Sequence, residues 1–276
     1  MSYTYTRRYT GPVRAVVLDW AGTAVDHGCL APVGVFRAVF SARGVAVTLD
    51  EARGPMGTHK RDHVARMCAM PGVRTRWIDA HGAPPTDADI DAMYAALGPL
   101  AIAALDAHAD LVPGLLPAIA ALRARGVRIG STTGYNRAML DRVVELAAAR
   151  GYHPDSHVAA SDVPAGRPAP YMAWEAVARL GVVEVQACVK VGDTVVDIEE
   201  GLNAGMWSIG VAASGNEVGL DVAALAALSP AERAACVGEA RAKLARAGAH
   251  LVLDSVAELP EAVDRVERWL AEGRRP

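Results

Sequence analysis

Short runs of aliphatic residues recur along the chain, and longer amphipathic stretches separate them. The first run spans residues 13–19, ends in an acid and is followed by small residues; similar runs occupy residues 127–131, 157–160, 187–192, 206–211 and 249–253. Between the runs, stretches such as 114–125 and 137–150 repeat their apolar residues at helical spacing. Strands that alternate with helices predict an α/β fold with a doubly wound, parallel, Rossmann-like sheet.

Polar residues stand where these predicted strands end. Asp19 ends the first run, and Thr132 and Thr133 follow the second. Asp193 follows the fourth run, 174 positions after Asp19. In a doubly wound sheet, ligands bind outside the carboxyl ends of the strands. We therefore expect these four side chains to converge on one site.

One long stretch breaks the alternation. From about Cys29 to His108 the apolar residues recur at helical spacing, and no run predicts a strand. Turn signals divide the stretch into short helices; they are Gly44, Gly54-Pro55 and residues 82–85. We predict a small all-helical cap domain of residues 28–108, inserted after the first strand. The α/β core domain then comprises residues 1–27 and 109–276.

The C-terminal part completes the predicted core. Residues 216–248 are rich in alanine and predict a helix. A last strand and a terminal helix over residues 255–271 follow it.

Composition and charge exclude several classes of protein. The 276 residues are 52% hydrophobic and 21% charged, which is typical of a globular protein. A net charge of −3 does not favour nucleic-acid binding. The four cysteines show no CxxC spacing and predict neither a disulfide framework nor a zinc site. The polar segment MSYTYTRRYTGP does not resemble a signal peptide, and no uncharged apolar run is long enough to span a membrane, so we expect a cytoplasmic protein.

Asp19 begins the segment Asp19-Trp20-Ala21-Gly22-Thr23. A carboxylate at a strand end, followed by a turn of small residues, can present an oxygen to a ligand beside backbone N–H groups. The alternative is that Asp19 caps the next helix.

Asp193 and Asp197 lie one helical turn apart after another predicted strand. Mg²⁺ takes oxygen ligands and few protein donors, so two such carboxylates suit this ion. The alternative is a solvated helix start, where acids are favoured by the helix dipole.

Hydroxyl and guanidinium groups complete the candidate site. Thr132 and Thr133 could hold a phosphoryl oxygen, and Arg167 in a proline-rich loop suits a phosphoryl group by its fork geometry. Each of these signals is weak alone, since such residues are usually structural.

Taken together and in this order, these segments resemble the four motifs of the haloacid dehalogenase superfamily of phosphotransferases. The first motif of that superfamily has a nucleophilic aspartate and, two residues later, a second aspartate that acts as acid and base. Here Ala21 stands in place of the second aspartate. A hydrolase of phosphate esters needs that acid to protonate the departing alkoxide, so the departure argues against an ordinary phosphatase.

A lysine in the predicted cap offers different chemistry. Lys60 shares a helical face with Val64, Met67 and Cys68, and His63 lies nearly on the same face. A lysine in an apolar setting has a lowered pKa and can form a Schiff base with a carbonyl group. The alternative is a lysine that runs along the cap surface with its amine in water.

From about residue 13 to 270, the chain resembles the phosphonoacetaldehyde hydrolases (phosphonatases). The segments that carry the resemblance are Pro-Met-Gly-x-x-Lys-x-Asp-His, Ser-Thr-Thr-Gly-Tyr at 131–135, and the motifs that contain Asp19, Arg167 and Asp193. The resemblance implies cleavage of the C–P bond of phosphonoacetaldehyde, with Lys60 forming an imine and Asp19 an aspartyl phosphate. It further implies a homodimer that associates through the cap.

The resemblance also implies roles for individual residues. Mg²⁺ would be held by Asp19, the Ala21 backbone carbonyl and Asp193, with Asp197 nearby. The phosphoryl group would be bound by Thr133 or Thr132, Arg167 and Gly22. The residues expected to tune Lys60, relay protons or contact the substrate are His63, Met56, Cys29 and Tyr135.

Two other functions remain open from the sequence. One is a phosphatase or mutase of the same superfamily that acts on a small phosphate ester, with Lys60 incidental. The other is a non-catalytic binding module, which is suggested by the replacement of the second aspartate of the first motif by Ala21.

Overall fold

The computed structural model describes residues 8–276. All six predicted strands are present: β1 (Ala15–Leu18), β2 (Arg128–Thr133), β3 (Ser156–Ala159), β4 (Cys188–Gly192), β5 (Trp207–Val211) and β6 (Leu251–Leu253). They form one parallel sheet in the order β3-β2-β1-β4-β5-β6. The predicted doubly wound α/β fold is therefore confirmed. The polar segment from which we predict the lack of a signal peptide lies largely in residues 1–7, outside the described residues.

Helices cover both faces of the sheet. Successive side chains of a strand point to opposite faces, and β1 follows this rule. Val16 and Leu18 join the core with α6 (Leu115–Ala124) and α12 (Leu259–Ala271), whereas Ala15 and Val17 join the core with α8 (Tyr171–Arg179). The other helices of this part are α7 (Arg137–Ala148), α9 (Val195–Asn203), α10 (Val222–Ala227) and α11 (Pro230–Arg246).

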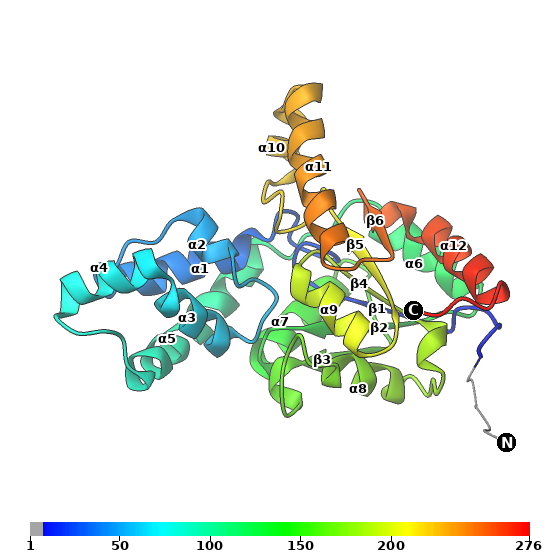
Figure 1. Cartoon of the computed structure of the whole chain (residues 1–276), viewed down its shortest axis with the longest axis horizontal. Helices are drawn as coiled ribbons and strands as arrows, with labels where there is room; N and C mark the ends of the chain where they lie inside the picture. The colour runs from blue at the N-terminus through cyan, green and yellow to red at the C-terminus, as the bar shows by residue number, and fades with distance from the viewer. Residues whose placement is uncertain (1–7) are drawn as a thin grey trace, which may run out of the picture.

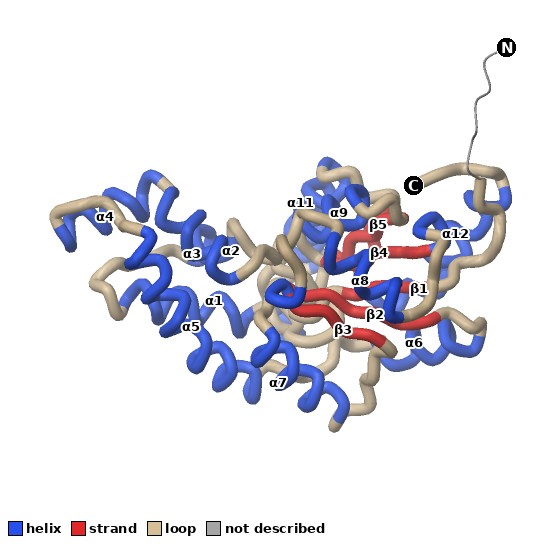
Figure 2. Tube along the Cα trace, turned by 90° about the horizontal axis from the view of Figure 1, so that it is seen from below, coloured by secondary structure: helices blue, strands red, loops and turns tan. Residues whose placement is uncertain are grey.

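Residues 28–108 form five helices and no strand, as expected. They are α1 (Leu30–Ser41), α2 (Leu49–Arg53), α3 (Lys60–Ala69), α4 (Pro71–His81) and α5 (Asp87–Ala107). Figures 1 and 2 show them together at one end of the molecule, beside the sheet. We call this group the cap; α5 packs on α1 and α3 within it and also on α7. The exact domain limits remain a prediction.

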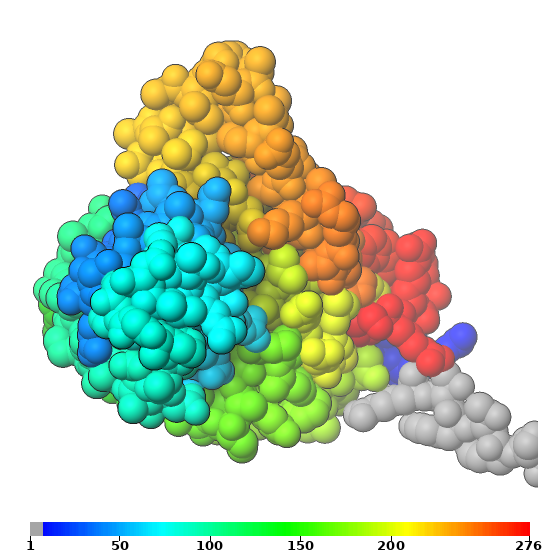
Figure 3. All heavy atoms as spheres, turned by 60° about the vertical axis from the view of Figure 1, so that its left-hand side comes forward, coloured from blue at the N-terminus to red at the C-terminus, as the bar shows by residue number. Residues whose placement is uncertain are grey.

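The Ala-rich segment differs from the single helix that we predict over residues 216–248. It divides into α10 and α11, because Ser229 caps a new helix with Glu232 and Pro230 occupies its first turn. In Figure 3 these two helices stand above the cap and the sheet-bearing part. The terminal helix α12 begins at Leu259, after a short 3₁₀ turn over Val256–Glu258.

One helix within residues 8–276, α5, is long and apolar enough to cross a membrane by length and composition. Its packing on α1, α3 and α7 accounts for part of its apolar surface. All four cysteines are free thiols.

The strand register brings the predicted site residues to one edge. Leu18, the last residue of β1, pairs with Ser131 on one side and with Val191 on the other. Asp19 therefore lies level with Thr132 and between the ends of β2 and β4. The boundary between β1 and β4 is where the strand order reverses, the position at which doubly wound sheets bind ligands.

Candidate active site

Three buried carboxylates cluster at this edge. Asp19 follows β1, Asp193 follows β4, and Asp197 lies in the first turn of α9. One oxygen from each lies within 4.8 Å of the others. The sequence prediction that acids from distant segments converge is confirmed.

Asp193 is held by hydrogen bonds rather than by a cation. Its Oδ1 accepts from the Thr23 hydroxyl at 3.1 Å, and its Oδ2 accepts from the Asn216 backbone N–H at 2.7 Å. Burial raises the pKa of Asp193 well above its usual range, and the negative charges of Asp19 and Asp197 raise it further. The site therefore disfavours the ionised form of Asp193, and a divalent cation beside it would stabilise the carboxylate.

Gly22 lies in the turn after Asp19 and packs against Asp193. Its N–H does not point to a ligand but donates to the carbonyl oxygens of Val25 and Asp26. A Cβ at this position would collide with the Asp193 carboxylate, and its φ of +87° is unfavourable for other residues. Gly22 lets the backbone approach Asp193, and its binding of the phosphoryl group stays a prediction.

Both carboxylate oxygens of Asp197 already have hydrogen-bond or ion-pair partners within the chain. Its Oδ1 accepts from Lys190 Nζ at 2.7 Å and lies 3.1 Å from Arg167 Nη1, while its Oδ2 accepts from the Thr194 hydroxyl at 2.5 Å. Burial opposes ionisation, but Arg167 and Lys190 lower the pKa of Asp197 below its usual value. Asp197 is better placed to hold these cations and cap α9 than to bind an ion directly.

Arg167 connects the acids of the site. Its guanidinium, which is fully buried, lies 2.7 Å from Asp19 Oδ1 and 2.8 Å from Glu200 Oε2. Its Nη1 also donates to the Gly57 carbonyl of the cap at 3.3 Å. Arg167 could be predicted from the sequence, but Glu200 could not, because a glutamate in an amphipathic helix carries no distinguishing signal.

The two threonines of β2 face opposite ways, as neighbours in a strand do. Thr133 lines the chamber beside Asp19, and its hydroxyl accepts from the Tyr135 N–H at 3.2 Å. The Thr132 hydroxyl instead contacts Arg167 at 2.8 Å and Glu200 at 3.2 Å. Thr132 does not line the chamber, so the expectation that it could bind a phosphoryl oxygen is corrected in favour of Thr133.

A small chamber lies above Asp19, with a volume of about 20 Å³. Cap and core residues line it together: Asp19, Ala21, Cys29, Pro32, Met56, Gly57, Lys60, Thr133, Gly134, Tyr135, Arg167 and Thr194. This volume accommodates little more than one water molecule. A ligand of several heavy atoms can enter only if the cap moves away from the core.

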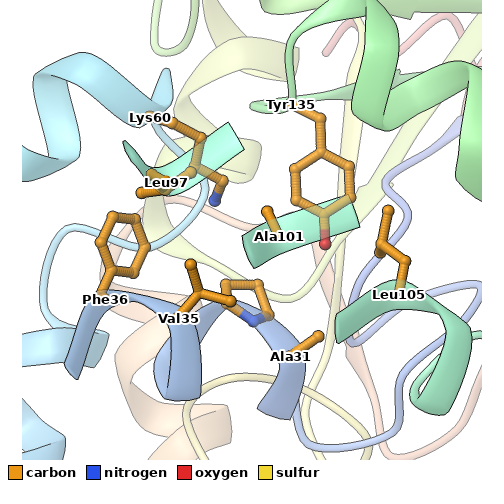
Figure 4. A pocket seen from close by; sticks show the side chains of 9 residues that line it. Ala31, Val35, Phe36, Lys60, Leu97, Ala101, Leu105 and Tyr135 are labelled. Carbon is orange, nitrogen blue, oxygen red and sulfur yellow. The ribbon is translucent and has the colours of Figure 1, made fainter. Parts of the chain in front are cut away.

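Lys60 is the first residue of α3, and its side chain is buried in the chamber. Its amine lies 5.4 Å from the Phe36 ring centroid and 5.1 Å from that of Tyr135 (Figure 4). Burial lowers the pKa of Lys60 to about 8, although acidic groups that include Asp19 oppose the shift. The expectation of a buried lysine with a lowered pKa is confirmed, and a surface lysine is excluded.

His63 lies one turn along α3 but does not line the chamber. Its Nε2 is 2.9 Å from the Ala52 carbonyl oxygen, and its ring stacks on Phe36 with centroids 3.7 Å apart. Burial and the charge of Lys60 place the pKa of His63 well below its usual value, so the ring is neutral. Its Nδ1 is buried and has no partner among the described residues.

Cys29 and Tyr135 line the chamber in neutral form. Burial raises the pKa of the Cys29 thiol and that of the Tyr135 hydroxyl well above their usual ranges. Met56 lies with them and is also buried.

The cap and the core touch closely at two glycines. A Cβ at Gly57 would collide with the Thr194 hydroxyl, and one at Gly134 would collide with the Thr58 carbonyl oxygen. Arg53 adds hydrogen bonds from α2 to the Gly28 carbonyl at 2.9 Å and the Gly219 carbonyl at 3.0 Å. The role of Arg53 could not be predicted from the sequence, since Gly219 lies far from it along the chain.

Comparison with known proteins agrees with this geometry. A family model described as haloacid dehalogenase-like hydrolase matches residues 13–205. A protein named phosphonoacetaldehyde hydrolase from Hahella chejuensis is 49% identical over all of this chain and 94% of its own length. One of the same name from Nitratidesulfovibrio vulgaris is 50% identical over 98% of this chain and 97% of its own.

The chain belongs to the phosphonoacetaldehyde hydrolase family. This family falls within the haloacid dehalogenase-like hydrolases, and the protein is a hydrolase. A crystal structure titled as a phosphonoacetaldehyde hydrolase-like protein from Oleispira antarctica matches it with a TM-score of 0.97 and 41% identity, over 100% of both chains. The family resemblance predicted from the sequence is confirmed.

Proposed function

We propose that the protein hydrolyses the C–P bond of phosphonoacetaldehyde to give acetaldehyde and phosphate. The observation that carries the proposal is the position of Lys60, whose buried amine shares one small chamber with Asp19. The names of the relatives give further support. Cleavage of a C–P bond would leave a carbanion unless its electron pair has an acceptor, and an iminium ion on Lys60 is such an acceptor.

Lys60 carries out the first step. A pKa of about 8 leaves a useful fraction of the amine unprotonated near neutral pH. The amine adds to the aldehyde carbon, water departs, and a protonated imine forms. We assign His63 Nδ1 as a proton acceptor near this amine, because it is buried, neutral and unpartnered among the described residues. Met56, Cys29 and Tyr135 enclose the imine and exclude water.

Asp19 carries out the second step. Its carboxylate attacks phosphorus, the C–P bond breaks, and the electron pair passes to the iminium carbon to give an enamine. Water then hydrolyses the aspartyl phosphate to phosphate. The enamine takes up a proton, and hydrolysis of the resulting imine releases acetaldehyde and the Lys60 amine. Arg167 and Thr133, which face Asp19 in the chamber, bind the phosphoryl oxygens.

Mg²⁺ fits the donor set, and hydrolases of this superfamily generally use it. Asp19, Asp193 and the Ala21 backbone carbonyl would hold the ion, and Asp197 would position Lys190 and Arg167 around it. The raised pKa of Asp193 supports this assignment, since its charge lacks a counterion. When bound, the ion neutralises charge on the phosphoryl oxygens.

We further propose a cytoplasmic homodimer, with the cap at the interface. The apolar helix α5 supports this, because only 22% of its most apolar window is buried within the chain. The cap limits are proposed at residues 28–108, and the small chamber requires that the cap open to admit the substrate.

A substrate comparison tests the proposed function. With Mg²⁺, the enzyme should release phosphate from phosphonoacetaldehyde and not from p-nitrophenyl phosphate or sugar phosphates. Lys60→Arg keeps the charge but cannot form an imine, so it should abolish the reaction. Turnover of phosphate esters that is undiminished in Lys60→Arg would instead support a phosphatase, and no release from any substrate would support a binding module.

A further inference from the structure

Lys60 faces a second cavity in addition to the chamber that holds Asp19. This cavity has a volume of about 10 Å³ and is lined by apolar side chains of α1 and α5, among them Pro32, Val35, Phe36, Leu97, Ala101 and Leu105. Figure 4 shows the Lys60 amine and the Tyr135 ring beside this space. Lys60, Pro32 and Tyr135 line both cavities, so the two meet at the amine.

The two cavities differ in chemistry. The chamber with Asp19 and Arg167 suits a charged phosphonate, whereas the second cavity is enclosed almost wholly by hydrocarbon. A carbonyl carbon joined to Lys60 Nζ carries two substituents. Its phosphonomethyl group must lie in the chamber, where Asp19 can reach phosphorus. The other substituent then points toward the apolar cavity.

We propose that the apolar cavity is a specificity subsite for this second substituent, and that Leu97 and Val35 restrict the enzyme to aldehydes. The inference rests on the proposed C–P hydrolysis. A cavity of about 10 Å³ has room for about one water-sized group, and a methyl group is larger than that. It admits the hydrogen of an aldehyde and resists the methyl group of a ketone.

Widening the cavity should therefore extend the substrate class to ketone phosphonates. The probe is acetonylphosphonate, in which a methyl group replaces the aldehyde hydrogen. Its imine with Lys60 forms with loss of water, and Asp19 attack transfers the electron pair of the C–P bond to the iminium carbon. Hydrolysis of both intermediates gives acetone and phosphate, with one water consumed overall.

The test uses Leu97→Ala, with Val35→Ala as a second variant that removes less volume. The matched control is Met93→Ala, which also shortens a buried side chain of α5 but lies one turn away and does not line the cavity. Circular dichroism and thermal melting establish that each variant is folded. The readout is the ratio of kcat/KM for acetonylphosphonate to kcat/KM for phosphonoacetaldehyde, with Mg²⁺ present.

The ratio should rise about tenfold or more in Leu97→Ala, less in Val35→Ala, and not in Met93→Ala, since one methyl group in an apolar pocket commonly changes specificity by that factor. An unchanged ratio in the folded cavity variants, or an equal rise in Met93→Ala, would overturn the inference. Turnover of phosphonoacetaldehyde by the wild type would still support the proposed function in that case. If the wild type releases no phosphate from phosphonoacetaldehyde, the proposed function fails and this inference fails with it.

Discussion

The Nη2 atom of Arg167 lies 2.7 Å from the Oδ1 atom of Asp19, and both side chains are buried. Arg167 thereby opposes the effect of burial, which raises the pKa of Asp19. The same guanidinium contacts Asp197 and Glu200. One side chain thus favours the ionised form of the proposed nucleophile and also contacts two further buried acids.

Arg167→Met should both inactivate and destabilise the protein. Removal of one partner from a buried ion pair costs about 3–5 kcal/mol, because the remaining charges lose their counterion. We expect a free energy of unfolding lower by about 3 kcal/mol and a kcat/KM lower by about 100-fold or more. Urea unfolding and a phosphate-release assay measure these. The control Arg241→Met removes a half-exposed arginine and should change stability by less than about 1 kcal/mol; equal effects would contradict the account.

Lys60→Met should abolish activity yet stabilise the protein in metal-free buffer. The folded-state pKa of Lys60 is about 8, below its ordinary 10.5. The unfolded chain therefore binds more protons between pH 8 and 10.5, and the stability of the wild type rises with pH across this window. The gain from Lys60→Met should reach up to about 3 kcal/mol below pH 8 and fade toward pH 10.5.

Denaturant unfolding of wild type and Lys60→Met at pH 7 and pH 10 measures this difference. Lys243→Met serves as the control, since that lysine is half exposed. If Lys60→Met is less stable than the wild type at pH 7, burial of the Lys60 amine does not destabilise the folded protein.

Asp193→Asn and Asp197→Asn should have opposite effects. Asp193 has no cation partner among residues 8–276, so its neutralisation should leave metal-free stability unchanged or higher but weaken Mg²⁺ binding by about 100-fold or more. Asp197→Asn removes the nearer of the two carboxylates that pair with Lys190 and should lower stability by about 3 kcal/mol. Calorimetric Mg²⁺ titration and thermal melting measure the pair. If one of the two variants showed both the weaker Mg²⁺ binding and the lower Tm, this would contradict the assignment of Asp193 to the metal and of Asp197 to the buried cations.

Gly134→Ala should impair closure of the cap. A Cβ at this position would collide with the Thr58 carbonyl oxygen, which belongs to the cap segment that leads to Lys60. A small displacement of reacting groups costs about 100-fold in rate, so we expect a loss of at least tenfold in kcat/KM with little change in Tm. Gly238→Ala in α11 meets no atoms within 4 Å and should leave activity intact. Wild-type kinetics for Gly134→Ala would show that this contact is not needed.

The sheet and the central site residues could be predicted from the sequence because their signals are local. Asp19 and Asp193 each follow an apolar run, and the carboxyl ends of parallel strands meet at one edge. The choice between Thr132 and Thr133 could not be made, because it depends on which residue ends β2 and to which face that residue points. Sequence pattern does not fix strand ends to a single residue.

Other parts of the site depend on tertiary contacts that no local pattern reveals. Glu200 lies in an amphipathic helix and Lys190 in a strand, and only the packing of α9 on β4 makes them partners of Arg167 and Asp197. Gly22 fits a ligand-binding turn by sequence, but its N–H bonds within the turn and its missing Cβ makes room for Asp193.

The most direct test of the account is borohydride reduction in the presence of phosphonoacetaldehyde, followed by peptide mass spectrometry. We expect a reduced two-carbon adduct on Lys60, with loss of activity, and no adduct in Lys60→Arg. An unmodified Lys60 in protein that still turns over phosphonoacetaldehyde would contradict the Schiff-base mechanism.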